Sequence, residues 1–288
     1  MGRRRWRVSG TSKPAGESFG AAVVRLSRPI DAVAVASVPI LLVVAYLLAP
    51  DPGPGLVFSY DEPTIRTAVT ANFVHVGPEH LSSNLLSYTL AIVTVYVLSV
   101  LAGRRDVFYT TFVAILVAFP LVLSVLNLAV PRDGAFAGAS GLVMAVSGLL
   151  PVALGGYLDR RFGLEISSEI AGFLFLVGLA ITALLAVPDG FGWIAVPAVV
   201  GALGYAVSMG RTETDIDRFR TAPAGFLEFA LWSVGLFVFL VAAAFPAGAV
   251  VGETIVNTYV HFLGYALGFL GSYFVFLLTE PGSERRAV

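Results

Sequence analysis

Long apolar runs, repeated along almost the whole chain, restrict this protein to one kind of environment. A helix needs about 20 apolar residues to cross the hydrocarbon core of a bilayer, which is about 30 Å thick. Eight runs of roughly that length occur in the sequence. With 57% hydrophobic and 13% charged residues, the 288-residue chain carries more apolar surface than one water-soluble core could bury. We therefore predict an all-α, polytopic membrane helix bundle.

Polar or turn-forming segments separate the eight runs, and four runs contain an internal proline. Membrane helices accept such prolines as kinks where neighbouring groups satisfy the freed carbonyls. We expect one transmembrane domain over residues 31–279, a mobile or surface-lying inner tail over residues 1–30, and a short inner tail over residues 280–288. The expected spans are 32–49, 81–101, 107–130, 139–154, 170–187, 191–209, 226–245 and 255–278, and the prolines are Pro39, Pro120, Pro151 and Pro197.

The positively charged residues are unevenly distributed between the loops. If the N-terminus is placed inside, every Lys and Arg except Arg66 and Arg132 falls on an inner segment. An even number of spans returns the C-terminus to the same side, and an excess of Lys and Arg marks the cytoplasmic side of membrane proteins. We expect a multi-pass protein of the cell membrane with both termini in the cytoplasm.

Several classes of function lack the residues that they require. The chain contains no cysteine, which excludes a thiolate nucleophile, a disulfide and a cysteine-based metal site. It has no phosphate-binding GxxxxGK[ST] run and no strip of alternating basic and aromatic residues, so nucleotide hydrolysis and a nucleic-acid partner have no support. We expect no metal and no cofactor.

Three short polar motifs interrupt the apolar sequence. They are HVGPEHLSSN at residues 75–84, GASG at 138–141 and HFLGYALG at 261–268, and each stands at the start of a long run. The three runs cross the bilayer in the same direction, from outside to inside. Polar groups within a membrane are costly and commonly mark functional sites. The motifs therefore predict a site near the outer face, where three run starts meet.

Four side chains with catalytic potential share this expected depth: His80, Asn84, Ser140 and His261. At 1.5 Å per residue, the four to six residues at the start of a helix cover only about 6–9 Å of depth. His80 and Asn84 are four residues apart, so they lie on one face of a helix. Such a pair is equally well explained as a helix cap or as polar contacts between helices.

The GASG motif places Ser140 between residues that have little or no side chain. Gly138 and Gly141 allow another backbone or a substrate to approach closely, and unpaired amides at a helix start can stabilise an oxyanion. Leu142 occupies the position of the second glycine in the GxSxG turn of soluble hydrolases. Taken alone, the motif is more typical of close helix packing.

The last motif carries glycines at a spacing that favours close contact between membrane helices. Gly264 and Gly268 follow His261 on the same run. If Gly264 packs against the helix of Gly141 and Ala145, His261 comes to lie beside Ser140. A neutral imidazole at that place is the base that activates a serine hydroxyl.

In this order, the three motifs resemble those of the rhomboid family of intramembrane serine proteases. The resemblance covers HVGPEHLSSN with His75, His80 and Asn84, GASG with Ser140, and HFLGYALG with His261, Gly264 and Gly268. It implies a six-helix core in which Ser140 attacks the scissile carbonyl and His261 acts as general base and then general acid. Asn84, His80 and the amide of Ser140 would form the oxyanion hole, with Gly138 and Gly141 beside it.

The same resemblance implies a substrate and a route for water. The substrate is a transmembrane segment of another membrane protein, cut near the outer face where small or helix-breaking residues let it unwind. A helix hides its carbonyls in internal hydrogen bonds, so unwinding is needed for attack. His75 and neighbouring serines would line the path of water to the site.

Three features depart from the family pattern. Three helices, instead of one, separate the helix of Ser140 from that of His261, which adds an apparent extra helix pair. The extra pair leaves open which helix gates the entry of the substrate, with run 226–245 as the favoured one. Met144 stands where the family often has a tyrosine under the histidine ring, and its thioether can contact an imidazole face. In the first outer loop, Ile65 and Arg66 stand where the family often has Trp-Arg.

Two other functions fit parts of the sequence. A noncatalytic member of the same fold would recognise membrane helices without cutting them, as Met144 and the extra pair allow. A polytopic transporter would bind a small solute through its intramembrane polar groups. Transporter sites favour the bilayer midplane and repeated halves, whereas these motifs gather near one face and no repeat is evident.

Overall fold

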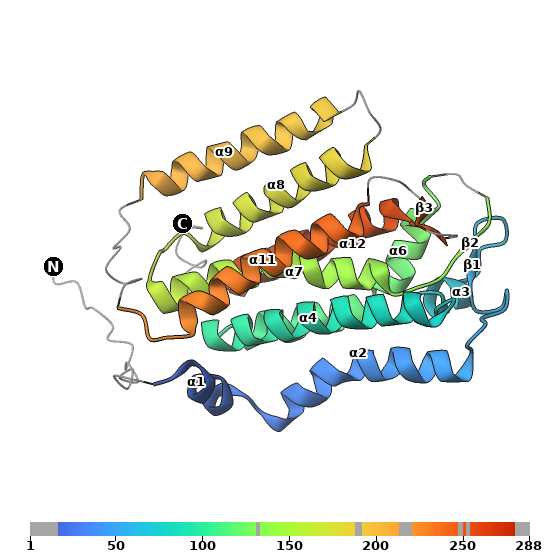
Figure 1. Ribbon diagram of the computed structural model, residues 1–288, viewed down its shortest axis with the longest axis horizontal. Coiled ribbons are helices and arrows are strands. Elements are labelled where there is room, and N and C mark those ends of the chain that lie inside the picture. Colours follow the sequence, from blue (N-terminus) through green and yellow to red (C-terminus); the bar gives the residue numbers. More distant parts are fainter. Residues whose placement is uncertain are drawn as a thin grey trace.

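The computed structural model describes residues 17–130, 133–187, 192–212, 221–246, 250–251 and 254–279. The described chain is almost entirely helical, and its long helices run side by side (Figure 1). In chain order the elements are α1 (Phe19–Leu26), α2 (Pro29–Leu48), β1 (Phe58–Ser59), α3 (Ile65–Thr70), α4 (Pro78–Ala102), α5 (Arg105–Val117), α6 (Phe119–Asn127), β2 (Ala135–Phe136), α7 (Ser140–Phe162), α8 (Ser167–Ala186), η1 (Gly192–Ala195), α9 (Val196–Gly210), α11 (Phe226–Ala244), β3 (Val250–Val251), β4 (Thr254–Ile255) and α12 (Thr258–Thr279).

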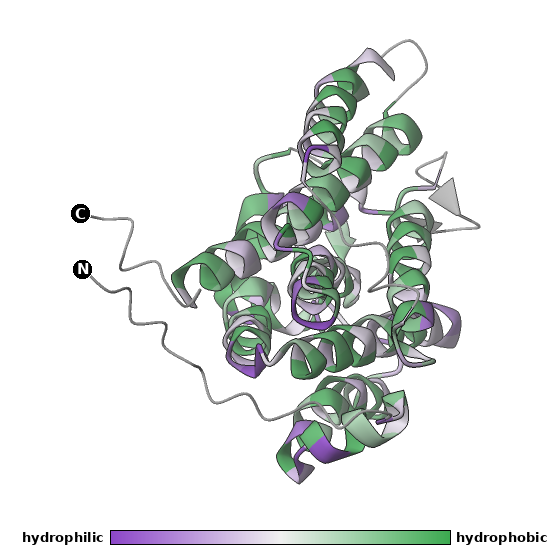
Figure 2. Cartoon of the chain, turned by 90° about the vertical axis from the view of Figure 1, so that its left-hand side faces the viewer, coloured by the Kyte–Doolittle hydropathy of each residue, from purple (hydrophilic) through white to green (hydrophobic). Residues whose placement is uncertain are grey.

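The structure confirms an all-α, multi-pass membrane bundle. Within the described residues, seven helices are long and apolar enough to cross a bilayer, and the α5–α6 pair makes an eighth if it counts as one bent span. Hydrophobic residues cover most of the helical ribbon (Figure 2). Many large apolar side chains point outward, as expected for a surface in contact with lipid; Leu47 and Leu48, for example, are 72% and 81% exposed.

The third expected span is not one continuous helix. The chain bends by 52° between α5 and α6, where Ala118 ends the first helix and Pro120 stands in the first turn of the second. Proline lacks the N–H that the body of a helix requires but is well suited to a first turn. The kink expected at Pro120 is thus a break between two helices of one bent pair, and it sets α6 at an angle beside the start of α7.

Two other boundaries differ from expectation. Helix α2 begins at Pro29, inside the expected tail, and the fourth span continues to Phe162 rather than ending at 154. Part of the tail is also ordered: Ser18 caps α1, and the ring of Phe19 lies 5.4 Å from that of Phe226 on α11. Residues 1–16 and the tail 280–288 lie outside the described residues.

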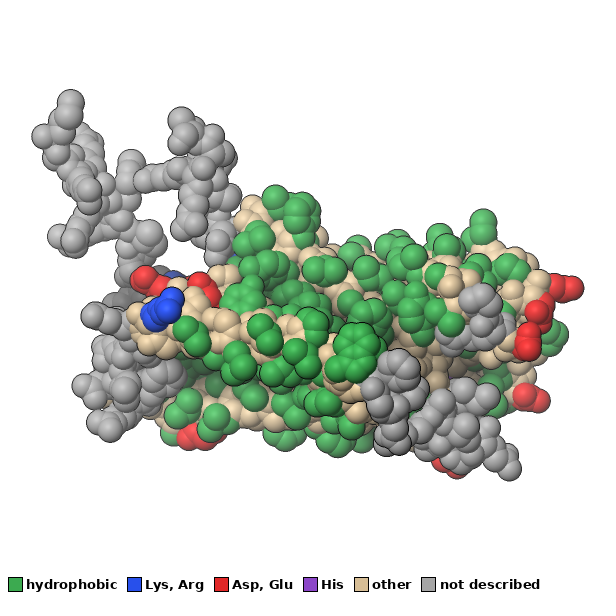
Figure 3. Space-filling view, turned by 90° about the horizontal axis from the view of Figure 1, so that it is seen from above, with side chains coloured by type: hydrophobic (Ala, Val, Ile, Leu, Met, Phe, Trp, Pro, Cys, Tyr) green, Lys and Arg blue, Asp and Glu red, His purple; other side chains and the backbone are tan. Residues whose placement is uncertain are grey.

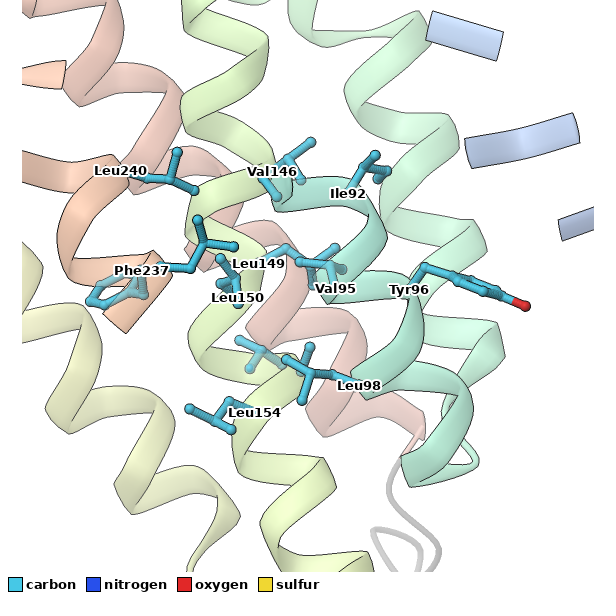
Figure 4. Packing of buried hydrophobic residues seen from close by; sticks show 14 of the residues in the cluster. Ile92, Val95, Tyr96, Leu98, Val146, Leu149, Leu150, Leu154, Phe237 and Leu240 are labelled. Atoms are coloured by element: carbon cyan, nitrogen blue, oxygen red, sulfur yellow. The ribbon is translucent and has the colours of Figure 1, made fainter. Parts of the chain in front are cut away.

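Helix α7 is the centre of the bundle. In its most apolar stretch, 89% of the residues are buried, against 17% for α2 and for the η1–α9 span. Side chains from α4, such as Ile92 and Val95, and from α11, such as Phe237 and Leu240, converge on α7 (Figure 4). The helix pair that includes α9 is peripheral, since α9 packs on α8 and η1. The residues at the start of α7 are thus held on several sides.

Seven of the eight described arginines lie at one end of the molecule, beside seven acidic residues, whereas the charged residues of the other end are mainly carboxylates. One end, the basic end, carries seven described arginines: Arg25, Arg28, Arg104, Arg105, Arg160, Arg161 and Arg211. The other, the acidic end, carries exposed carboxylates at Asp51, Asp61, Glu62, Glu79 and Asp133, together with Arg66. Apolar side chains cover the surface between the ends (Figure 3). Helices α4, α7 and α12 all begin at the acidic end, so the three polar motifs meet there.

Candidate active site

Helices α7 and α12 touch through their backbones at the level of the polar motifs. A Cβ added to Gly264 would lie 2.2 Å from the carbonyl oxygen of Gly141, and one added to Gly268 would lie 2.1 Å from that of Ala145. No side chain fits at either distance. The structure therefore shows the contact predicted between Gly264 and the helix of Gly141 and Ala145.

This contact sets Ser140 and His261 at the same level. One residue after Ser140, a Cβ on Gly141 would lie 3.3 Å from Cγ2 of Val260, the residue before His261. Ser140 opens α7, and His261 lies in the first turn of α12. The Ser140 hydroxyl has no hydrogen-bond partner among the described residues. In unliganded enzymes, nucleophile–base hydrogen bonds are often long and tighten only when substrate binds.

The imidazole of His261 is buried and fixed in one orientation. His261 is 7% exposed, and its Nδ1 lies 2.8 Å from the carbonyl oxygen of Ala244 at the end of α11. A carbonyl only accepts hydrogen bonds, so Nδ1 carries the hydrogen and Nε2 keeps its lone pair. The ring of Phe245 meets the imidazole edge to face, with centroids 6.1 Å apart. In its neutral form, His261 is thus held as the Nδ1–H tautomer.

The loop before α4 shapes the GASG segment. The amide of Gly138 donates to the carbonyl of Ala71 at 2.8 Å, and the amide of Ala139 donates to Nε2 of His75 at 3.3 Å. Gly138 has a φ of 127°, and a Cβ there would lie 2.5 Å from Cε1 of His80. Only glycine combines this backbone with such a close ring. The imidazole of His80 therefore lies against the residue two before Ser140.

His75 has a different place from the one expected. It is fully buried, which does not fit a residue lining a path for water, and it holds Ala139 instead. Burial, followed by the nearby His80, lowers the pKa of His75 to about 4. The neutral ring can then accept the amide hydrogen at Nε2. His75 supports the start of α7 rather than forming part of a channel.

N–H groups without a hydrogen-bond partner occur at the start of α7 and on α4. The first backbone bond of α7 runs from Val143 to Ala139 at 2.9 Å, so the amides of Ser140, Gly141 and Leu142 have no partner within the helix. The Asn84 side chain is 5% exposed, and its Nδ2 has no hydrogen-bond partner. A buried unpaired donor costs about 1–3 kcal/mol. Such donors are suited to a developing oxyanion.

The two remaining supporting residues differ in their positions. Met144 is buried, and its Cβ lies 3.2 Å from the place of a Cβ on Gly264, so it packs one turn below His261. Arg66 is exposed on α3 and has no partner among the described residues. The structure does not bring Arg66 into the site.

A capping residue that the sequence reasoning missed fixes the start of α12. The side-chain oxygen of Asn257 accepts the amide of Val260 at 3.1 Å, and its backbone carbonyl accepts the amide of His261 at 3.2 Å. The Asn257 amide also donates to the hydroxyl of Tyr60, which accepts from Asn127 as well. An Asn just before an apolar helix is a recognisable N-cap signal, so this role was readable from the sequence.

The pair formed by α8 and the η1–α9 span borders an apolar groove near the first turn of α12. Its volume is about 540 Å³, and it lies between α8, the η1–α9 span and the facing ends of α11 and α12. Phe245 lines this groove and also contacts His261. The described residues hold no group of three or more His, Asp, Glu or Cys side chains placed to bind a metal.

No family model, no curated protein and no solved structure matches this chain.

Proposed function

We propose that this protein is a rhomboid-like intramembrane serine endopeptidase that cuts transmembrane segments of other membrane proteins. The observation that carries the proposal is the backbone contact between Gly264 and Gly141, which sets His261 and Ser140 at one level. The Nδ1–H tautomer of His261 supports it, because the free Nε2 is the atom a general base uses. The first amides of α7 and the unpaired Nδ2 of Asn84 are the donors proposed for the remaining chemical requirement, the oxyanion hole.

The proposed reaction proceeds in two steps. The Ser140 hydroxyl adds to the scissile carbonyl while its proton moves to Nε2 of His261, and the oxyanion accepts hydrogen bonds from Asn84, His80 and the first amides of α7. His261 then returns the proton to the leaving amine, which leaves an ester on Ser140. Water, deprotonated by His261, attacks this ester. The bond between the acyl carbon and the Ser140 oxygen then breaks, the acid product leaves, and His261 returns the proton to the Ser140 oxygen.

The depth of the site supports a substrate that crosses the membrane. Ser140, His261 and Asn84 all lie in the first two turns of helices that begin at the acidic end. A spanning substrate would therefore be cut near one membrane face, and small or helix-breaking residues would expose its carbonyls. With the basic end in the cytoplasm of a cell-membrane protein, this is the outer face.

A noncatalytic helix-binding protein is the second candidate. The observation that favours it is the Ser140 hydroxyl, which makes no hydrogen bond with His261 in the described residues. The unpaired amide of Asn84 argues for chemistry, because a binder gains nothing from a buried donor without a partner. A midplane transporter fits less well, since the polar groups gather at one end of the helices.

Covalent labelling separates these candidates without knowledge of the natural substrate. The purified, folded protein is treated with a fluorophosphonate, and the modified residue is mapped by mass spectrometry. Ser140 should be labelled, and Ser140→Ala or His261→Ala should abolish the adduct. Ser147→Ala is the matched control: Ser147 lies two turns further along α7 and donates to the Val143 carbonyl. Absence of labelling in the folded wild type would favour the noncatalytic binder.

A cleavage assay then tests the substrate class. The protein is reconstituted in liposomes with single-span test proteins whose outer halves carry either a Gly-Ala-rich segment or an all-leucine segment. Preferential cleavage of the first, lost in Ser140→Ala, is expected. Equal cleavage of a soluble unfolded protein and of the spanning protein would contradict intramembrane specificity.

A further inference from the structure

The carbonyl group of Ala244 occupies the position that a carboxylate takes in a Ser-His-Asp triad. It accepts the Nδ1 hydrogen of His261 at 2.8 Å, on the side of the ring opposite to Nε2. In a triad, the third group holds the histidine in the correct tautomer and stabilises the imidazolium that forms. We infer that the C-terminal end of α11, through the Ala244 carbonyl, is the positioning element of the catalytic dyad; this inference rests on the proposed function.

The location of Ala244 makes its carbonyl a stronger hydrogen-bond acceptor than a carbonyl in the middle of a helix. Ala244 is the last residue of α11, so its carbonyl is one of the four that have no partner within the helix. The aligned peptides of a helix leave about half a negative charge at this end. A positively charged imidazolium is favoured at a helix C-terminus. The helix end thus favours the protonated His261 that forms during the reaction.

The two ends of α11 are held differently. At the basic end, the Tyr157 hydroxyl donates to the carbonyl of Phe226 at 2.7 Å, and Glu228 accepts the amide of Gly225 at 2.8 Å. Phe19 of α1 also packs on this end. At the acidic end, Ala244 and Phe245 contact His261 directly. A displacement of this end would therefore release His261 while the basic end of α11 stays in place.

This arrangement makes the position of the α11 end a condition for the reactive form of His261. With its acidic end closed on His261, the imidazole is locked as the Nδ1–H tautomer and the dyad is competent. With that end displaced, the ring can rotate or change tautomer, and Ser140 loses its base.

The test changes the direction of one backbone carbonyl. Phe245→Pro pushes Ala244 out of the helical conformation, because the residue before a proline avoids it, and so turns the Ala244 carbonyl away. Phe245→Leu is the matched variant, since it also removes the aromatic ring but leaves the backbone unchanged. The full chain is labelled with ¹⁵N-histidine and reconstituted in lipid. Comparison with His261→Ala identifies the His261 signals.

The wild type and Phe245→Leu are expected to show a protonated Nδ1 and a bare Nε2 at His261, and Phe245→Pro a mixture of tautomers. The rate of fluorophosphonate labelling at Ser140 should fall at least about 10-fold further in Phe245→Pro than in Phe245→Leu. A wild-type Nε2–H tautomer, or equal spectra and rates in the two variants, would overturn the inference. If the tautomer changes as expected but no form is labelled, the positioning by Ala244 holds and the proposed protease activity fails.

Discussion

Gly264 lies against the carbonyl of Gly141 so closely that α12 and α7 have no room for a side chain between them. Gly264→Ala should therefore push the helices apart at the level of Ser140 and His261. Overpacking of this kind costs about 1–3 kcal/mol, and we expect labelling of Ser140 to slow at least about 10-fold.

Gly271→Ala is the control for this substitution. Gly271 lies on the same helix, and a Cβ there meets nothing within 4 Å. It should leave the labelling rate unchanged and preserve or slightly raise the unfolding temperature. Equal labelling of both variants would show that the glycine contact does not set the distance between Ser140 and His261.

Asn84 and Asn72 are both buried, but truncation of Asn84 should change the reactivity of Ser140, whereas truncation of Asn72 should change the stability of the fold. Asn84→Ala removes an unpaired donor, so labelling at Ser140 should fall by about 10²–10³-fold with little change in unfolding temperature. Asn72 donates to Ala68, Pro120 and Ser124, and Asn72→Ala should lower the unfolding temperature by leaving these groups unpaired. A destabilised Asn84→Ala with unchanged labelling would assign Asn84 a purely structural role.

The low pKa of His75 predicts a loss of stability in acid. The folded protein holds this pKa at about 4, whereas an unfolded chain has the ordinary value near 6.5, so the unfolded state binds the proton more readily. The stability that neutral His75 contributes to the folded protein is fully present above pH 6.5. Up to about 3 kcal/mol of it is lost as the pH falls from 6.5 to 4.

His75→Gln tests this contribution because glutamine keeps an acceptor for the Ala139 amide but does not titrate. Unfolding temperatures are compared between pH 7.5 and pH 4.5 for the two proteins. The variant should show a shallower decline than the wild type. Parallel curves would show that protonation of His75 does not destabilise the fold in this range.

Asp31 is the polar anchor of α2, whose surface is otherwise mostly exposed. Its carboxylate accepts from the hydroxyls of Tyr109 at 2.6 Å and Tyr96 at 2.8 Å and pairs with Arg105 at 3.1 Å. Asp31→Asn should therefore lower stability by roughly 3 kcal/mol, measured by thermal unfolding.

The effect of Asp31→Asn on reactivity provides a second check, because the cluster lies at the basic end, far along the helices from Ser140. In the variant that remains folded, the labelling rate of Ser140 should equal that of the wild type. Asp106→Asn is the control, since Asp106 is exposed at the same end. Equal stability of the two variants would contradict an anchoring role for Asp31.

The sequence alone was sufficient to predict the features of the fold that a bilayer requires. Hydrophobic length marks a spanning helix whatever its neighbours are, so all eight runs correspond to helices or, in one case, to a bent pair. Counting the spans gave the direction of each helix, and these directions placed the three polar motifs at one end of the bundle. The spacing of Gly264 and Gly268 also predicted a close helix contact, because small residues let two helix backbones approach and larger residues keep them apart.

Tertiary structure alone decided the contacts that depend on backbone groups and on helix rotation. The Ala244 carbonyl has no signature in the sequence, since every residue carries the same group. The unpaired state of Asn84 and the burial of His75 arise from their neighbours. The break before Pro120 belongs to the packing of α6, which lies mainly against α3 and α12, because proline tolerates either a kink or a new helix start. Hydropathy and spacing thus determined which helices form and which ends meet, and packing determined which atoms face Ser140 and His261.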